Sequence, residues 1–319
     1  MSIARHIREI GRGKDGTRSL SRDEAFDLMS QVLAGTVSDL EVGAFAVAMR
    51  IKGESLAELA GFLDAAHARC QTLAPGGRTV VLPSYNGARR LPNLTPLLAL
   101  LLARQGVQVL VHGFRQGLGR VTSFDIVPAL GLTVARHAGD VELAWRRSEP
   151  AFMAIDDLCP ALARLLAVRE VIGLRNSGHT IAKLLQPVHG GDALRVVNYT
   201  HPEYAHLLNE FMVLTGADAV LMRGTEGEPV ADTRRPTPLS VYVGGQPRPE
   251  FAGGGGSSDA DDPAPLPRTL DAESTAQFAT AVLNGEAATP PALRRQVDVL
   301  LRALDAMALR GEQPHGAPA

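Results

Sequence analysis

The segment PSYNGARR, residues 83–90, has the residue types of an anion-binding loop. Its Asn86-Gly87 dipeptide favours a tight turn with a positive φ, and the adjacent arginines Arg89 and Arg90 follow that turn. Backbone amides that precede a helix attract anions, and guanidinium groups add full positive charges. The segment therefore predicts a phosphate-binding loop.

A second segment, VHGFRQGLGR at residues 111–120, has related chemistry. Its three glycines allow the backbone to approach a ligand closely, and Arg115 and Arg120 supply two more cations. Each segment taken alone is more typical of a solvated loop than of a binding site. Both lie in a window of sixty residues, 65–124, that contains seven arginines and no Asp or Glu. That distribution favours anion binding, because a chain of net charge −2 can still carry one strongly positive face.

The composition is that of a globular protein, with 319 residues of which 45% are hydrophobic and 21% charged. These values exclude disordered, collagen-like and coiled-coil classes. The longest apolar stretch, residues 94–103, is too short to span a bilayer, and the N-terminus has no apolar signal-peptide core. The two cysteines, Cys70 and Cys159, lie far apart, which favours a reduced environment. We expect a cytoplasmic protein with no membrane partner.

The first seventy residues predict a bundle of short helices. Three serine–glutamate pairs have the spacing of a capping box, and each opens an apolar stretch with helical periodicity. The pairs are Ser21 with Glu24, Ser38 with Glu41, and Ser55 with Glu58. Gly35 and Gly53 stand where helix C-caps belong. Residues 150–186 are also expected to be helical, so the helical domain is predicted to comprise residues 1–74 with about 158–188.

From residue 78 onward, short β-branched runs alternate with helical stretches. This order predicts an α/β domain with a largely parallel central sheet, formed by residues 75–157 with 189–319. The expected strands are 79–82, which we expect to stop at Pro83, then 107–111, 133–135, 194–197 and 219–222. Both arginine-rich segments follow strands, and binding sites in such sheets lie beyond the carboxyl ends of the strands. Residues 252–268 are expected to form an exposed loop and residues 311–319 a frayed tail.

The chain resembles the anthranilate phosphoribosyltransferase family along nearly its whole length. The segments that carry the resemblance are VHGFRQGLGRVTSFDIVPALG at residues 111–131 and CPALARLLAVREVIGLRNSGHTIAKLLQP at residues 159–187. Asn93-Leu94-Thr95 is similar to the Asn-x-Ser/Thr element of these enzymes, and Arg175 stands where they have a substrate-contacting arginine. The resemblance implies an N-terminal helical domain joined to an α/β domain, usually in a homodimer.

The departures from the enzyme pattern fall at the expected active site. The glycine-rich GTGGD loop that holds the pyrophosphate of phosphoribosyl pyrophosphate is replaced by residues 83–87, where a proline removes one amide donor. The KHGN motif becomes residues 111–114. The Asp-Glu pair that the enzymes use for magnesium has no match, and the nearest stretch is Thr225-Glu226-Gly227-Glu228. We interpret that stretch as a solvated turn, with a single-metal site at Glu226 and Glu228 as the alternative.

PSYNGARR, RNSGHTIAKLLQP and GTEGEPVADTRRP together resemble the YbiB-type branch of the family. That resemblance implies a protein that keeps the fold and the dimer but binds nucleic acid in place of phosphoribosyl transfer. Our first hypothesis is therefore a sequence-nonspecific nucleic-acid binder that favours single strands, with no catalytic residue, metal or cofactor and a homodimer through the helical domain. The residues expected to face the phosphates are Arg89, Arg90, Arg115, Arg120, Arg175 and Lys183, with Asn86 and Gly87 in the loop. Tyr85 and Phe114 are candidates for base stacking or for core packing.

The second hypothesis is a divergent phosphoribosyltransferase that uses Mg²⁺ and phosphoribosyl pyrophosphate. Such an enzyme needs a diphosphate cradle built without the glycine-rich loop and a metal site built without the usual acids. His112, His179 and His189 fall near the expected cleft. None has a Cys, Asp or Glu at ligand spacing, so we expect them in turns or caps.

Overall fold

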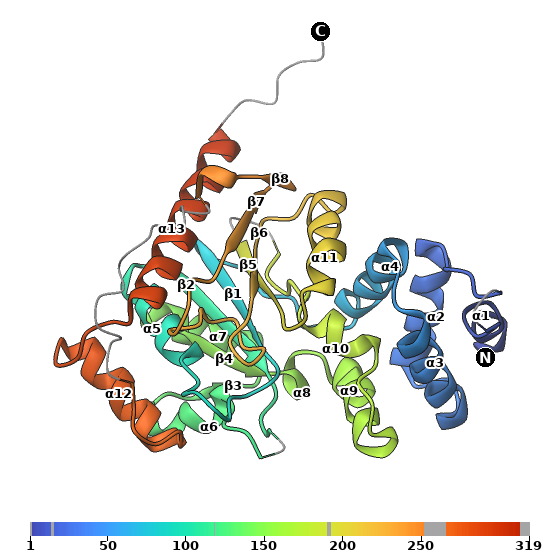
Figure 1. The fold of residues 1–319 in the computed structure, drawn as a ribbon, viewed down its shortest axis with the longest axis horizontal. Helices are drawn as coiled ribbons and strands as arrows, with labels where there is room; N and C mark the ends of the chain where they lie inside the picture. Colours follow the sequence, from blue (N-terminus) through green and yellow to red (C-terminus); the bar gives the residue numbers. More distant parts are fainter. Residues whose placement is uncertain (1, 14–15, 118, 190–192, 252–265, 313–319) are drawn as a thin grey trace, which may run out of the picture.

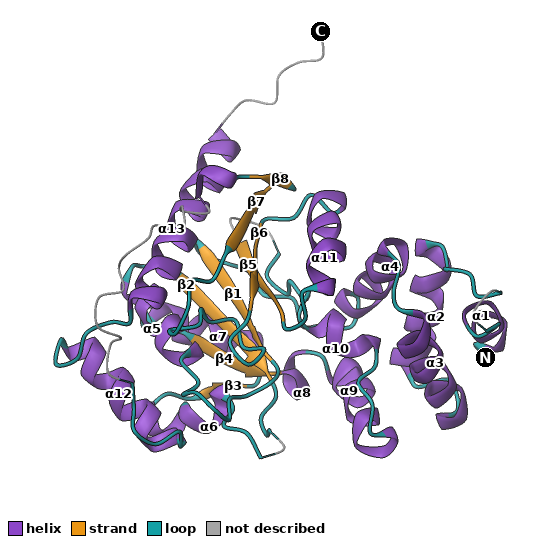
Figure 2. Cartoon of the chain, viewed as in Figure 1, coloured by secondary structure: helices purple, strands orange, loops and turns teal. Residues whose placement is uncertain are grey.

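The computed structural model describes residues 2–13, 16–117, 119–189, 193–251 and 266–312. In this part of the chain a helical unit stands beside an α/β unit (Figures 1 and 2). The helical unit contains α1 (Ala4–Ile10), α2 (Arg22–Ala34), α3 (Asp39–Lys52), α4 (Leu56–His67), α9 (Pro160–Ile172) and α10 (Ser177–Ala182). This architecture confirms the predicted fold class.

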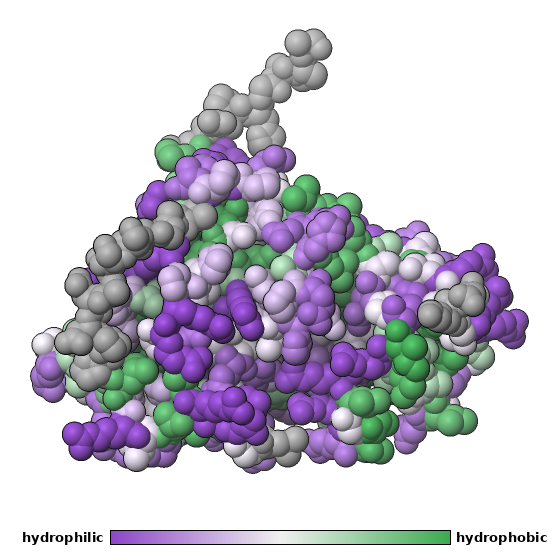
Figure 3. Space-filling view, viewed as in Figure 1, coloured by the Kyte–Doolittle hydropathy of each residue, from purple (hydrophilic) through white to green (hydrophobic). Residues whose placement is uncertain are grey.

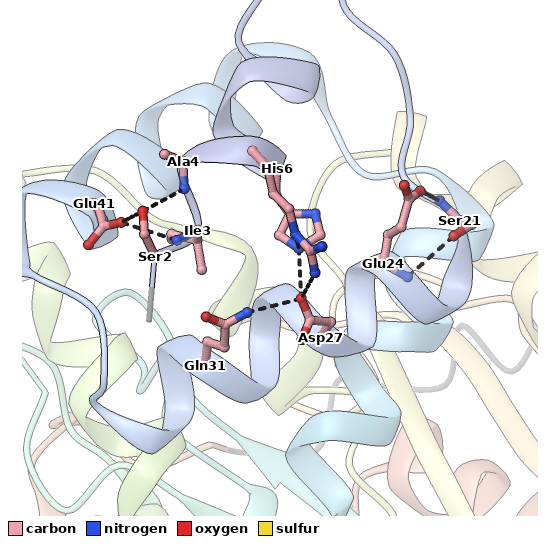
Figure 4. Close-up of polar contacts among 10 residues, drawn as sticks. Ser2, Ile3, Ala4, His6, Ser21, Glu24, Asp27, Gln31 and Glu41 are labelled. Atoms are coloured by element: carbon pink, nitrogen blue, oxygen red, sulfur yellow. Dashed lines mark hydrogen bonds and ion pairs between the residues drawn. The ribbon is translucent and has the colours of Figure 1, made fainter.

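Helices α2, α3 and α4 begin where the sequence predicts, at the three capping boxes, and α2 and α3 end at the predicted glycines. In each of the three capping boxes the serine oxygen accepts the amide of the residue three positions on, and the glutamate accepts the serine amide. Gly35 ends α2 with a φ of 69°, a left-handed conformation that glycine adopts without strain. The N-terminal segment is fastened to the bundle by polar contacts, because Glu41 accepts the Ser2 hydroxyl at 2.7 Å and the Ile3 amide at 3.1 Å (Figure 4).

The α/β unit is built on one sheet of eight described strands in the order β3-β4-β2-β1-β5-β6-β7-β8. The strands from β3 to β6 are parallel, β7 runs antiparallel to β6, and the edge strand β8 runs antiparallel to β7. Their bounds are β1 Thr79–Ser84, β2 Gln108–Gly113, β3 Val134–Ala135, β4 Ala151–Ala154, β5 Ala193–Tyr199, β6 Ala219–Arg223, β7 Leu239–Val243 and β8 Gln246–Pro247. The carboxyl ends of the parallel strands meet at one edge, and there the loops after β1, β2 and β6 come together.

Helices cover both faces of this sheet, as a largely parallel sheet requires. One face packs against α5 (Thr95–Arg104) and α13 (Pro291–Glu312), and the other packs against α7 (Ala138–Arg146) and α11 (Glu203–Leu214). The remaining elements are α6 (Ser123–Ile126), α8 (Ile155–Leu158), α12 (Ala272–Asn284) and the short 3₁₀ turns Pro128–Leu130 and Pro249–Phe251. Apolar residues of α11 join the core of the helical unit, so a continuous hydrophobic cluster connects the two units.

Strand β1 does not stop at Pro83, contrary to our expectation. Pro83 pairs with His112 of β2, and Ser84 pairs with Gly113. The missing amide of Pro83 costs no hydrogen bond between strands, because β5 pairs with β1 only as far as Val81. Beyond Val81, a side chain of β5 contacts this side of β1 in place of the β5 backbone. Asn198 donates its side-chain amide to the Pro83 carbonyl at 3.3 Å.

The expected all-helical segment 150–186 is also partly wrong, since it begins with β4, a buried strand between β2 and β3. Its residues, Ala-Phe-Met-Ala, lack the β-branched side chains that mark a strand in sequence. At the other end of the chain, residues 311 and 312 belong to α13 rather than to a frayed tail. Residues 313–319 and most of the expected loop, 252–265, lie outside the described residues.

Candidate anion-binding site

Backbone amides of the loop after β1 donate hydrogen bonds to two carboxylates of the loop after β6. Asn86 and Gly87 each donate their amide to Glu228 Oε1 at 2.8 Å. Glu228 Oε2 accepts the hydroxyl of Ser84 and that of Thr95, the latter at 3.3 Å. A buried carboxylate loses several kcal/mol of hydration, so it needs such donors on both oxygens. Glu228 is fully buried and has them.

The second carboxylate, Glu226, binds the next three amides along the same loop. Its Oε2 accepts the amides of Arg89, Arg90 and Leu91 at 2.8, 2.9 and 3.2 Å. These three hydrogen bonds and the nearby charge of Arg120 lower the pKa of Glu226 against the opposing effect of its partial burial. We call the five amides of residues 86, 87 and 89–91 the amide cradle, and residues 225–228 the carboxylate turn.

The carboxylate turn is shaped to fit the cradle. Glu226 has a φ of +52°, which is uncommon for a residue with a side chain, and Gly227 has a φ of +91°. A Cβ at Gly227 would lie 1.6 Å from Asn86 Nδ2, so only glycine allows this approach. The Asn86 side chain donates to the Glu226 carbonyl at 2.8 Å. The stretch is therefore packed into the fold, and our interpretation of it as a solvated turn is wrong.

This geometry changes the roles expected for the loop residues. The amides of Asn86 and Gly87 hold Glu228 in place of a ligand phosphate. A Mg²⁺ ion does not fit between the two carboxylates, because both oxygens of Glu228 and one oxygen of Glu226 face N–H and O–H donors, which repel a cation. Among the described residues no group of three His, Cys, Asp or Glu side chains is arranged to hold a metal ion.

Tyr85 lies in the core, and its ring is closed to a nucleic-acid base. The side chain is buried, packs edge-on against His112 and Phe114, and its hydroxyl lies 2.7 Å from His112 Nδ1. Burial lowers the pKa of His112 to about 3, so the imidazole is neutral at physiological pH. Tyr85 is therefore removed from the candidate interface, while Phe114 remains partly exposed.

The arginines of the two loops lie around the cradle in different states. Arg89 and Arg90 are exposed, and no side-chain ion pair is recorded for either of them among the described residues. Arg120 donates to the Gly87 carbonyl at 3.2 Å, and the two loops are joined there by paired amide–carbonyl bonds between Ala88 and Val121. Arg115 is bound instead to the carboxylate of Asp157, which reduces its net contribution to a positive surface.

Arg175 and Lys183 approach the same region from the helical unit and differ in accessibility. Arg175 is exposed and donates to Asn86 Oδ1 at 2.9 Å. Its pKa is lowered by desolvation and then by the charges of Arg169, Arg120 and Arg50, so these three guanidinium groups lie within electrostatic reach of Arg175. Lys183 is turned inward, where its ammonium group donates to Asn198 Oδ1 at 2.7 Å and to the Gly227 carbonyl at 3.1 Å. Desolvation lowers the pKa of Lys183 to about 8.

Two hollows flank the cradle. The interdomain cleft, of about 370 Å³, lies between α3 and α10 on one side and β5 and α11 on the other. Its lining includes Arg50, Arg175, His179, Tyr199 and Tyr204. The second hollow, of about 580 Å³, lies between the two arginine loops and is lined by Arg89 and Arg120. Both hollows also have acidic residues in their linings, Glu54 and Glu203 in the first and Asp125 and Asp271 in the second, so the cations there alternate with carboxylates.

His179, like His112, occupies a structural position. His179 lies in the first turn of α10 and contacts the capping residue Asn176. Burial and then the charge of Arg175 lower the pKa of His179 to about 4.

No described helix is both long enough and apolar enough to cross a membrane.

Sequence reasoning missed Glu226 and Glu228 as cradle ligands. The signal for them was two acids flanking a glycine after a strand, which a turn also explains.

Comparison with known proteins agrees with this architecture. Residues 5–70 match the glycosyl transferase family helical bundle domain. The YbiB protein of Escherichia coli is 39% identical over 300 residues, which cover 93% of this chain and 92% of that protein. The anthranilate phosphoribosyltransferase of Methanopyrus kandleri is 31% identical over 57% of this chain and 53% of its own length. The crystal structure of the Thermus thermophilus enzyme of that name superposes with a TM-score of 0.69 at 22% identity, covering 95% of this chain and 98% of that one.

The helical domain and the mostly parallel α/β domain define an anthranilate phosphoribosyltransferase-like fold of glycosyltransferase family 3. Within that family the chain belongs to the YbiB-type branch.

Proposed function

We propose that the protein binds single-stranded nucleic acid without sequence preference, through the cationic surface around the cradle. The observation that carries this proposal is that the backbone amides and the arginine side chains of the loop after β1 have different surroundings. Its amides are held by the chain's own carboxylates, while the side chains of Arg89 and Arg90 extend from the same residues into solvent. Guanidinium groups suit phosphates along a strand, and such contacts carry no sequence information.

The proposed interface is narrower than the one predicted from sequence. Arg89, Arg90, Arg120 and Arg175 form its centre. Desolvation and then the charges of Arg169, Arg120 and Arg50 lower the pKa of Arg175, and a polyanion would relieve the part that is due to charge. Arg115 contributes less because of Asp157, and Lys183 acts by holding the carboxylate turn. Phe114 and the cleft tyrosines Tyr199 and Tyr204 offer rings for unpaired bases, which supports the preference for single strands.

The same surface argues against the alternative, a Mg²⁺-dependent phosphoribosyltransferase. Such an enzyme must bind the diphosphate of its donor at amides that here hold Glu226 and Glu228. Calorimetry with phosphoribosyl pyrophosphate and Mg²⁺ distinguishes the two functions. Saturable micromolar binding would support the enzyme, and an absence of heat at millimolar ligand supports the nucleic-acid binder.

A homodimer through the helical unit is part of this proposal. Leu40, Val47 and Ile51 lie on one face of α3 at helical spacing, with Leu40 83% and Ile51 82% exposed. Figure 3 shows apolar surface over this unit, at the lower right. An exposed apolar helix face of this kind is typical of an association surface. Pairing two copies would place two cationic surfaces in one particle and lengthen the nucleic-acid footprint.

The decisive test compares Arg89→Ala/Arg90→Ala with the wild type in a salt titration of single-stranded DNA binding. Each lost phosphate contact lowers the slope of log K against log salt by about 0.7, so the double variant should lower the slope by about 1.4 and weaken all sequences alike. The matched control is Arg146→Ala/Arg147→Ala, an adjacent exposed pair at the end of α7, on the opposite edge of the sheet. A wild-type affinity that stays flat with salt would refute the proposal.

A further inference from the structure

Glu226 and Glu228 hold the same cradle in unlike ways. Glu228 is fully buried and bonded through both oxygens to two amides and two hydroxyl groups. Glu226 is only partly buried, binds its three amides through one oxygen, and sits at a positive φ. Because less burial and fewer contacts are lost when Glu226 leaves, it is the more exchangeable of the two anions.

The half of the cradle beneath Glu226 has the chemistry of a phosphate site. Three successive backbone amides that point at one oxygen form an anion-binding concavity. The charge of Arg120 acts on the same carboxylate, and the side chains of Arg89 and Arg90 begin at two of the three donating residues. A carboxylate already bound there demonstrates that these donors accept an anion.

Resting on the proposed function, we infer that Glu226 is a built-in competitor for one phosphate of the bound strand. The phosphodiester takes the amides of residues 89–91 when Glu226 swings into solvent, and Glu228 remains in place and keeps the loop folded. The chemical class of the ligand is a phosphate group, with the amides as donors and Arg120 as the neighbouring charge. In the free protein Glu226 thus occupies this subsite. A nucleic-acid strand must displace the Glu226 carboxylate in order to gain its strongest contact.

Glu226→Gln keeps the size of the side chain and removes its charge, so it weakens the internal competitor without emptying the loop. Single-stranded DNA should then bind about tenfold more tightly, because charge-assisted hydrogen bonds are about twice as strong as neutral ones. Glu203→Gln is the matched control, since Glu203 is an exposed glutamate that lines the interdomain cleft and contacts no cradle amide in the described structure. Equal gains from the two variants would mean that only net charge matters, and would overturn the inference.

A second measurement needs no nucleic acid and separates this inference from the proposed function. Glu226→Gly removes the carboxylate and suits the positive φ, so the loop is expected to remain folded, as thermal unfolding would verify. Titrated with inorganic pyrophosphate in a calorimeter, this variant should show saturable binding that the wild type and Glu203→Gln lack. If Glu226→Gly binds pyrophosphate while no form of the protein binds DNA, the cradle inference stands and the proposed function fails. If a folded Glu226→Gly binds no pyrophosphate, the cradle is not a phosphate site and the inference is wrong.

Discussion

At the scale of single residues, neighbours in one loop have opposite surroundings. Tyr85 points into the core and pairs with a neutral histidine, while Arg89, four positions on, is exposed. The Nε2 atom of His112 is buried with no hydrogen-bond partner among the described residues, so the Tyr85 hydroxyl is the partner recorded for that ring. A buried polar pair of this kind depends on both members.

Replacing Tyr85 with phenylalanine should therefore change stability and leave DNA affinity as it is. The substitution leaves Nδ1 of His112, like Nε2, without a hydrogen-bond partner in the described part of the chain. This loss lowers the free energy of unfolding by about 1–3 kcal/mol. Urea unfolding measures the loss, and Tyr204→Phe at the interdomain cleft serves as the comparison. Weaker DNA binding with unchanged stability would instead show that the Tyr85 hydroxyl contacts the nucleic acid.

At the scale of elements, the capping boxes do more than start helices. Glu41 closes the box of α3 and also receives the Ser2 hydroxyl and the Ile3 amide, so one carboxylate joins the N-terminal segment to the third helix (Figure 4). These hydrogen bonds, with that of Ser2 the largest effect, lower the pKa of Glu41 from its ordinary 4.5 to about 2.

The stability contributed by Glu41 should consequently depend on pH. A carboxyl group whose pKa is lowered on folding stabilises the fold fully above its unfolded pKa, and that contribution is lost as the pH falls toward the folded value. The difference in unfolding free energy between the wild type and Glu41→Gln should be constant from pH 7 to about 4.5 and shrink between about 4.5 and 2. Denaturant unfolding across this range tests it, and a difference independent of pH would contradict the assignment.

At the scale of the whole molecule, the loop arginines and the apolar face of α3 lie on different parts of the chain. Arg89, Arg90 and Arg120 lie in loops at the carboxyl edge of the sheet, and the exposed apolar residues Leu40 and Ile51 lie on the helical unit. This separation allows two copies to pair through the helices without covering the proposed nucleic-acid surface.

Ile51→Glu should convert a dimer into a monomer, because it places a charge in the centre of an apolar contact. Analytical ultracentrifugation measures the mass, with Leu214→Glu as the control, since Leu214 is an exposed apolar residue at the end of α11. A single mass shared by the wild type and both variants would exclude this face as the dimer surface. The DNA footprint of the monomer should also be shorter.

Local sequence signals predicted much of this protein. Capping boxes, helical periodicity and β-branched runs act over a few residues, so the first helices and most parallel strands lie where expected. Strand β4 was missed because it lacks such residues, and the extent of β1 was missed because Asn198 serves the Pro83 carbonyl from another strand. The arginine-rich character of the two loops was equally visible in the sequence.

The state of the anion cradle was decided by tertiary structure alone. Glu226 and Glu228 are some 140 positions from the amides that they hold, and no local rule relates the two loops. They meet because parallel strands bring their carboxyl ends to one edge of the sheet, which sets an acid-free loop against an acidic turn. Residue types alone predict that this edge attracts anions. Only the folded sheet determines that the carboxylates of Glu226 and Glu228, from the same chain, occupy the amides of the loop.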